Sequence, residues 1–221
     1  MKTTLLVTVA LLSLAASAQD IKVKSGNEKF SSGSHDCFKT TIYYAEKDKV
    51  MSEWKSKLND FKDEKVKRSG SEIFGDNILI KDWGNNTVDI YSVFDEDKDK
   101  KTVSMAVAVD LGGAYLTGSD KSKANYIEKL MQDFAVKMSK EAVKDELNST
   151  EKALGKLEGE QSDLEKENKG LKDDIEDYKK KISKAESDIK DNEGKQTKKK
   201  SEIEAQKKVV EGVKKKLDGI N

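Results

Sequence analysis

The sequence predicts an α+β fold, with a small antiparallel sheet covered by helices on one face and followed by a long α-helical coiled coil. Nearly all the aromatic residues, including both tryptophans, lie between residues 20 and 138, where strand-like and helix-like stretches alternate. The remainder of the chain is rich in charged residues and carries a heptad repeat. The 221 residues include no proline, which favours uninterrupted helix because an internal proline costs about 3 kcal/mol.

Residues 1–18 have the features of a signal peptide. Lys2 supplies a positive charge, an apolar stretch covers residues 5–14, and Ala16-Ser17-Ala18 matches the small-x-small pattern of a cleavage site. The apolar stretch is shorter than the ~20 residues that a bilayer-spanning helix needs, which favours cleavage over an uncleaved anchor. We therefore expect export to the periplasm or the extracellular space, in a bacterial envelope, with no stable membrane insertion after cleavage.

The head domain, residues 19–138, is predicted to have the order β-α-β-β-β-α. Helical spacing of Val50, Trp54 and Leu58 and alternation through Val103, Met105, Val107 and Val109 are the clearest local signals. Residues 21–24 could form a short first strand, followed by a loop at 25–34. We expect a strand at 37–44, a helix from about 46 to before Arg68-Ser69-Gly70, strands at 73–80, 87–94 and 102–110, and a helix from about 120. The turns at 84–86 and 95–101 predict hairpins between the last three strands, and Gly75 could bend the first of these.

Residues 139–221 are predicted to continue the last head helix as a coiled coil. An apolar side chain recurs at heptad positions a and d without a slip in register, and a period of 3.5 residues indicates a partner helix wound around this one. The apolar members of this seam are Val143, Leu147, Leu154, Leu157, Leu164, Leu171, Ile175, Tyr178, Ile182, Ile189, Ile203, Val210, Val213 and Leu217. The alternatives are a solitary charged helix or a disordered charged tract.

The arrangement of the coiled coil has several solutions. Gly194 lies in the weakest stretch, residues 191–195, where one continuous helix is favoured over a hairpin turn because a turn has no reason to preserve heptad phase. Acidic residues are in excess in the first half of the repeat and basic residues in the second half. This asymmetry favours antiparallel pairing over a parallel dimer, and either an antiparallel dimer or an intramolecular hairpin would satisfy it.

No set of residues predicts catalysis, cofactor binding or metal binding. His35 and Cys37, the only histidine and the only cysteine, lie two apart in a predicted strand, about 7 Å from each other, and are interpreted as packing residues. The acidic run that begins at Asp95 lacks the glycine and glutamate of a calcium loop, and Gly112-Gly113 lacks the rest of a phosphate-binding loop.

Lys+Arg and Asp+Glu are both 42, so no excess of positive charge points to nucleic acid. The sequence favours an exported, non-enzymatic structural or interaction protein without cofactors, with a head for recognition and a coiled coil for association with its own copy or another helical protein. A periplasmic chaperone-like or activator factor acting on envelope proteins is the alternative, and an enzyme that uses the head is less favoured.

Overall fold

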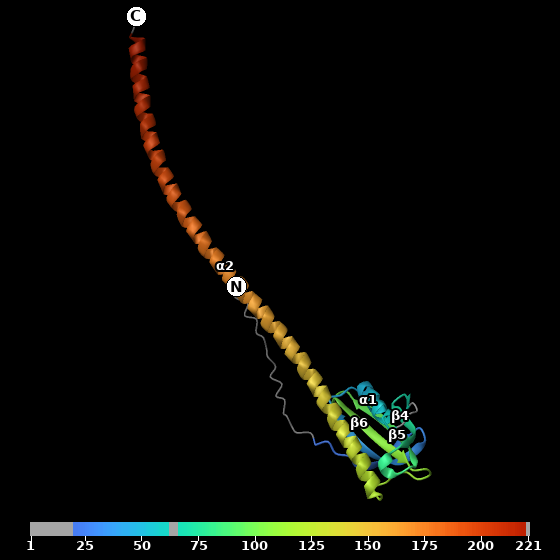
Figure 1. The fold of residues 1–221 in the computed structure, drawn as a ribbon. Helices are drawn as coiled ribbons and strands as arrows, with labels where there is room; N and C mark the ends of the chain where they lie inside the picture. Colours follow the sequence, from blue (N-terminus) through green and yellow to red (C-terminus); the bar gives the residue numbers. More distant parts are fainter. Residues whose placement is uncertain (1–19, 62–65, 220–221) are drawn as a thin grey trace. The chain divides into compact units, whose positions relative to one another are not determined.

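The computed structural model describes residues 20–61 and 66–219, so the expected signal peptide, residues 1–18, lies outside the described residues. The chain divides into two compact units that meet between Thr150 and Glu151. The elements, shown in Figure 1, are β1 (Lys24–Phe30), β2 (Gly33–Tyr43), α1 (Lys47–Asn59), β3 (Lys67–Ser69), β4 (Glu72–Leu79), η1 (Lys81–Trp83), β5 (Thr87–Asp97), β6 (Thr102–Asp110) and α2 (Lys121–Asp218).

The head is an α+β domain built on one antiparallel sheet, as predicted. Its strand order is β1-β2-β6-β5-β4-β3, and each neighbouring pair is antiparallel. The predicted hairpins β4–β5 and β5–β6 are confirmed, and the register of β4 shifts between Gly75 and Ile78, where a bend was expected.

The structure corrects the expected start of the head. The predicted strand at 21–24 is not formed, and the Gly- and Ser-rich stretch predicted as a loop contains β1 and the start of β2. Hydrogen bonding along the edge of β2 outweighs the low strand propensity of this stretch. Gly26 suits the position, because a Cβ there would lie 3.3 Å from the Lys39 side chain.

The second correction concerns the segment after α1. The helix ends at Asn59, before Arg68-Ser69-Gly70 as predicted. Within the expected break, however, Lys67–Ser69 forms the short edge strand β3. Gly70, with φ of 58°, makes the turn from β3 into β4. The sheet therefore has six strands, two more than the predicted order, because both additions are edge strands that depend on pairing with a neighbour.

Both helices pack on one face of the sheet, as predicted. The rings of Trp54 in α1 and Phe134 in α2 meet edge to face with centroids 4.9 Å apart. The Trp54 indole N–H donates a buried 2.8 Å hydrogen bond to Ser92 Oγ in β5, and the Tyr43 backbone N–H donates to Ser139 Oγ at 2.9 Å. These contacts join β2, β5 and α1 to the buried face of α2.

The opposite face of the sheet carries a second, smaller cluster. Phe30 and Cys37 pack there over Ala106 and Ala108 of β6. The turn after β1 reaches across this face, since the Ser31 backbone N–H donates a 2.8 Å hydrogen bond to a carboxylate oxygen of Glu72 in β4. The sheet must therefore curl strongly, and the two small alanines leave room for the β1–β2 hairpin to fold over it.

Helix α2 begins where the sequence predicted. Asp120 precedes it and accepts a hydrogen bond from the backbone N–H of Lys123, which lowers the pKa of the Asp120 carboxyl. The side chains of Ile127, Met131 and Met138 are buried against the sheet, and Ser139 is the last buried residue of the helix. From Val143 through Gly219 every residue is exposed.

Candidate association surface

The apolar residues of the exposed part of α2 recur at heptad spacing. All fourteen predicted seam residues lie on this helix with more than two fifths of each residue exposed, from 45% for Val143 to 69% for Leu217. Among the large hydrophobic residues exposed along the described part of α2, only Val209 lies off positions a and d. The structure thus shows the predicted seam residues as exposed positions of a helix.

The seam includes a hollow near its C-terminal end. This hollow, of about 420 Å³, is lined by Ile203, Gln206, Lys207, Val210, Glu211 and Lys214. Ile203 and Val210 occupy position a, Gln206 position d, and both lysines position e. In a coiled coil, residues at positions such as a, d and e surround a hole into which a side chain of the facing helix inserts.

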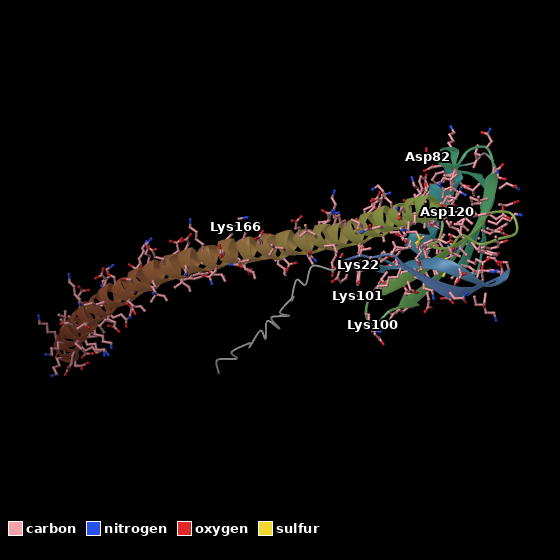
Figure 2. The ribbon with its side chains drawn as sticks, turned by 90° about the horizontal axis from the view of Figure 1, so that it is seen from below. Lys22, Asp82, Lys100, Lys101, Asp120 and Lys166 are labelled. Carbon is pink, nitrogen blue, oxygen red and sulfur yellow. The ribbon has the colours of Figure 1, made fainter. Side chains whose placement is uncertain are left out.

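The rest of the helix surface is polar, with short-range ion pairs. Lys166, on the side away from the seam, projects into solvent and forms a 3.1 Å ion pair with Asp163 (Figure 2). Lys156–Glu160 and Lys215–Glu211 are further exposed pairs along the helix. Such pairs contribute only about 0.3–0.5 kcal/mol each, so they support the helix weakly.

The helix does not turn at the expected weak point. Gly194 lies within an unbroken helix, and this structure has one continuous α2, the arrangement favoured over a hairpin turn. Gly155, Gly159, Gly170 and Gly212 also lie within α2, and a Cβ added at any of them would meet nothing within 4 Å, so packing does not require glycine there. Each costs roughly 1 kcal/mol relative to alanine, so these glycines weaken the helix.

No family model, curated protein or solved structure matches this chain. The role of the surface must therefore be inferred from its own residues. Their pattern is an apolar heptad repeat between charged rows, at exposed positions of one helix.

The predicted His35 and Cys37 pair lies on the curled face of the sheet. Cys37 is 3% exposed, and burial raises the pKa of its thiol to about 11, which disfavours the reactive thiolate. The His35 ring stacks on Tyr115 with centroids 3.7 Å apart, and its Nε2 is buried without a hydrogen-bond partner among the described residues. No hydrogen bond joins His35 and Cys37 in this part of the chain.

Sequence reasoning missed this aromatic cluster. Tyr115 reaches it through a β-bridge to Asp110, and Tyr91 contributes from β5. The available signal was the position of Tyr91, which has the opposite parity from the buried residues of β5 and so faces the other side of the sheet.

The acidic run that begins at Asp95 and the Gly112-Gly113 pair both lie at turns of the chain. Asp97, in the acidic run after Asp95, pairs with Lys100, which lowers the pKa of the Asp97 carboxyl. The backbone N–H groups of Gly112 and Gly113 both donate to Asp110 Oδ1 at 2.9 Å, and both glycines have positive φ. Over residues 20–61 and 66–219, no cluster of three or more His, Cys, Asp or Glu residues could hold a metal ion.

One hollow of the head measures about 560 Å³ and lies beside the β5–β6 hairpin. Its lining carries both signs of charge, including Glu46, Lys47, Glu96 and Lys101. Glu96 also accepts a hydrogen bond from the backbone N–H of Lys47 in the first turn of α1. In the described part of the chain, no helix is long and apolar enough to cross a membrane.

Proposed function

We propose that this is an exported, non-enzymatic interaction protein whose α2 helix associates with a second helix to form a coiled coil. The observation that carries the proposal is the exposed stripe at positions a and d, which keeps heptad phase from Val143 to Leu217. A solitary helix has no reason to keep a period of 3.5 residues, because its own repeat is 3.6.

Energetics support the same conclusion. Fully burying a Leu or Ile side chain contributes about 1.5–3 kcal/mol, and residues such as Leu171 and Ile189 are still more than half exposed. Burial of the remaining surface would add roughly 1 kcal/mol per seam residue. Over the length of the seam this gain exceeds the weak contributions of ion pairs and offsets the cost of the helical glycines.

The head has the role of recognition in this proposal. The charged hollow at Glu46, Glu96 and Lys101 and the curled aromatic face around Tyr115 are the surfaces available for it. The buried thiol of Cys37, whose pKa is raised to about 11, supports a packing role over a nucleophilic one.

The test compares two double variants of the mature chain by sedimentation velocity and far-ultraviolet circular dichroism. Leu171→Asn with Ile189→Asn changes the seam, whereas Lys169→Asn with Lys190→Asn introduces the same residues at position b, outside it. We expect the seam variant to lose its oligomer and much of its helicity, since it removes four apolar side chains from a dimer, or roughly 4 kcal/mol. The control should keep both. Equal sedimentation and helicity in wild type and both variants would contradict the proposal.

A further inference from the structure

The row of charges at position e of α2 has an unusual symmetry. Read from Glu151 in steps of seven, it is acidic three times and then basic twice. It continues as acidic twice and then basic three times, and the row is Glu151, Glu158, Glu165, Lys172, Lys179, Glu186, Glu193, Lys200, Lys207 and Lys214. Reversing the order of this row and exchanging the signs reproduces it, with the centre between Ile182 and Ser183.

We propose that the partner of α2 is a second copy of the same chain, aligned antiparallel, with the two-fold axis passing near Ile182 and Ser183. This inference rests on the proposed function. In an antiparallel pair related by a two-fold axis, a row of one helix meets the same row of its copy. With this centre every e-row pair is attractive: Glu151–Lys214, Glu158–Lys207, Glu165–Lys200, Lys172–Glu193 and Lys179–Glu186.

A parallel dimer combines attractive pairs, such as Glu167–Lys172 and Asp174–Lys179, with repulsive ones. There, position e faces position g of the copy, so Glu165 would meet Glu160 and Lys200 would meet Lys195. Lys199, at position d, would also meet its own copy within the seam. Like charges at these positions destabilise a parallel pair, whereas the antiparallel pair avoids each of these contacts.

Most side chains of the e row make no ion pair within residues 20–61 and 66–219. In the described part of α2, Lys207 makes an ion pair with Glu204, and Glu165 accepts a hydrogen bond from Gln161. The other eight side chains of the row make no ion pair with described residues, although ion pairs are frequent elsewhere on the helix. The row therefore has charge available for a partner.

The seam agrees with the same centre. Gln161 and Asn168 form the polar interval before it, and Asn192, Gln196, Lys199 and Gln206 form the one after it. With this centre Gln161 lies opposite Gln206 of the other copy, and Asn168 lies opposite Lys199. The hollow at Ile203 and Val210 would face Leu164 and Leu157 of the second copy. There Lys207 and Lys214 meet Glu158 and Glu151.

Energy transfer between labelled copies tests the alignment. Lys152 and Lys215 both lie at position f, so cysteines placed there carry dyes outside the seam. Cys37 is buried, and the wild-type chain is the control for its labelling. In the antiparallel dimer, a Lys152→Cys donor lies within roughly 30 Å of a Lys215→Cys acceptor on the other copy. It lies about 90 Å from a Lys152→Cys acceptor.

We expect strong transfer in the Lys152/Lys215 mixture and little in the Lys152/Lys152 mixture. The reverse pattern would mean a parallel dimer, which overturns this inference and leaves the proposed coiled-coil function standing. Absence of transfer in both mixtures, with a monomer in sedimentation, also overturns it. The seam variants described above then decide separately whether the helix uses its seam at all.

Charge reversal gives a second, independent test. Glu165→Lys or Lys200→Glu alone turns two attractive contacts per antiparallel dimer into repulsive ones and should raise the dimer Kd about tenfold or more. The double variant should return it to near the wild-type value. In a parallel dimer each single change would instead remove a like-charge contact and tighten binding. Asp173→Lys and Lys208→Glu, at position f, are the matched controls and should leave the Kd within about threefold of wild type.

Discussion

Replacing Ser92 with alanine removes the hydrogen-bond acceptor of a fully buried indole. Trp54 and Ser92 are both 0% exposed. The 2.8 Å hydrogen bond from the Trp54 indole N–H to Ser92 Oγ connects α1 to the middle of β5. No water can reach the indole N–H at this depth. The donor would therefore lose its partner without a replacement.

The expected loss follows from that burial. Leaving a buried donor unsatisfied costs about 1–3 kcal/mol. The change from serine to alanine removes only the hydroxyl group, so the change in apolar packing contributes little to the free energy of unfolding. For a domain of this size, such a loss lowers the Tm by roughly 4–15 °C. Trp54→Phe combined with Ser92→Ala removes both polar partners, so the two single costs should not add.

Urea unfolding followed by tryptophan fluorescence measures this effect, and Trp83 still reports it in the Trp54→Phe background. Ser104→Ala is the matched control, because Ser104 lies on the neighbouring strand β6 and is exposed, with only a 3.4 Å hydrogen bond to the Asp95 carbonyl. It should change the free energy of unfolding by less than about 0.5 kcal/mol. If Ser92→Ala were equally mild, Ser92 would not face Trp54, and the register of β5 against α1 would be wrong.

Three further predictions concern α2, the thiol and one ion pair. Gly170→Ala should stabilise the tail helix by roughly 1 kcal/mol in thermal circular dichroism, because a Cβ there meets nothing within 4 Å and the position lies off the seam; a destabilised helix would contradict this. Cys37, with its pKa raised to about 11, should react with a thiol reagent at pH 8 at least about a hundredfold more slowly in the folded protein than in urea, and equal rates would show that it is accessible. The hydrogen bond from Lys49 holds the pKa of the Asp145 carboxyl below its ordinary value, so this contact stabilises the head above about pH 4, and that contribution is lost as the pH falls through the lowered pKa. Titration by NMR should show the Asp145 pKa rising in Lys49→Ala, and an unchanged value would mean that the pair does not form in solution.

The central hairpins could be predicted almost to the residue. Alternation through Val103, Met105 and Val107 marked β6 with its observed bounds, because the large apolar residues on its main-core face alternate with small or polar residues on the other face. The first turns of α2 were predicted for the same reason, since Ile127, Met131 and Met138 recur at helical spacing and are all buried.

The edge strands could not be predicted in this way. β1 runs through Ser25, Gly26 and Asn27, which have low strand propensity, and it exists because Cys37 and its neighbours in β2 offer hydrogen bonds. Ser31 and Glu72, which form a hydrogen bond, lie 41 positions apart, so no local sequence pattern predicts their contact. The aromatic stack of His35 on Tyr115 depends on the same curling of the sheet.

The amino-acid sequence alone determines the heptad seam, its polar intervals and the self-complementary charges of the e row. These features can be predicted because periodicity along one helix depends only on the spacing of residues in the sequence. Only the tertiary structure shows which strands complete the sheet and how the β1–β2 hairpin folds over Ala106 and Ala108. It also shows that the buried face of α2 ends at Ser139. These features depend on pairing and packing between residues distant in the chain. Their free energy comes from shared hydrogen bonds and buried area, which single-residue propensities do not contain.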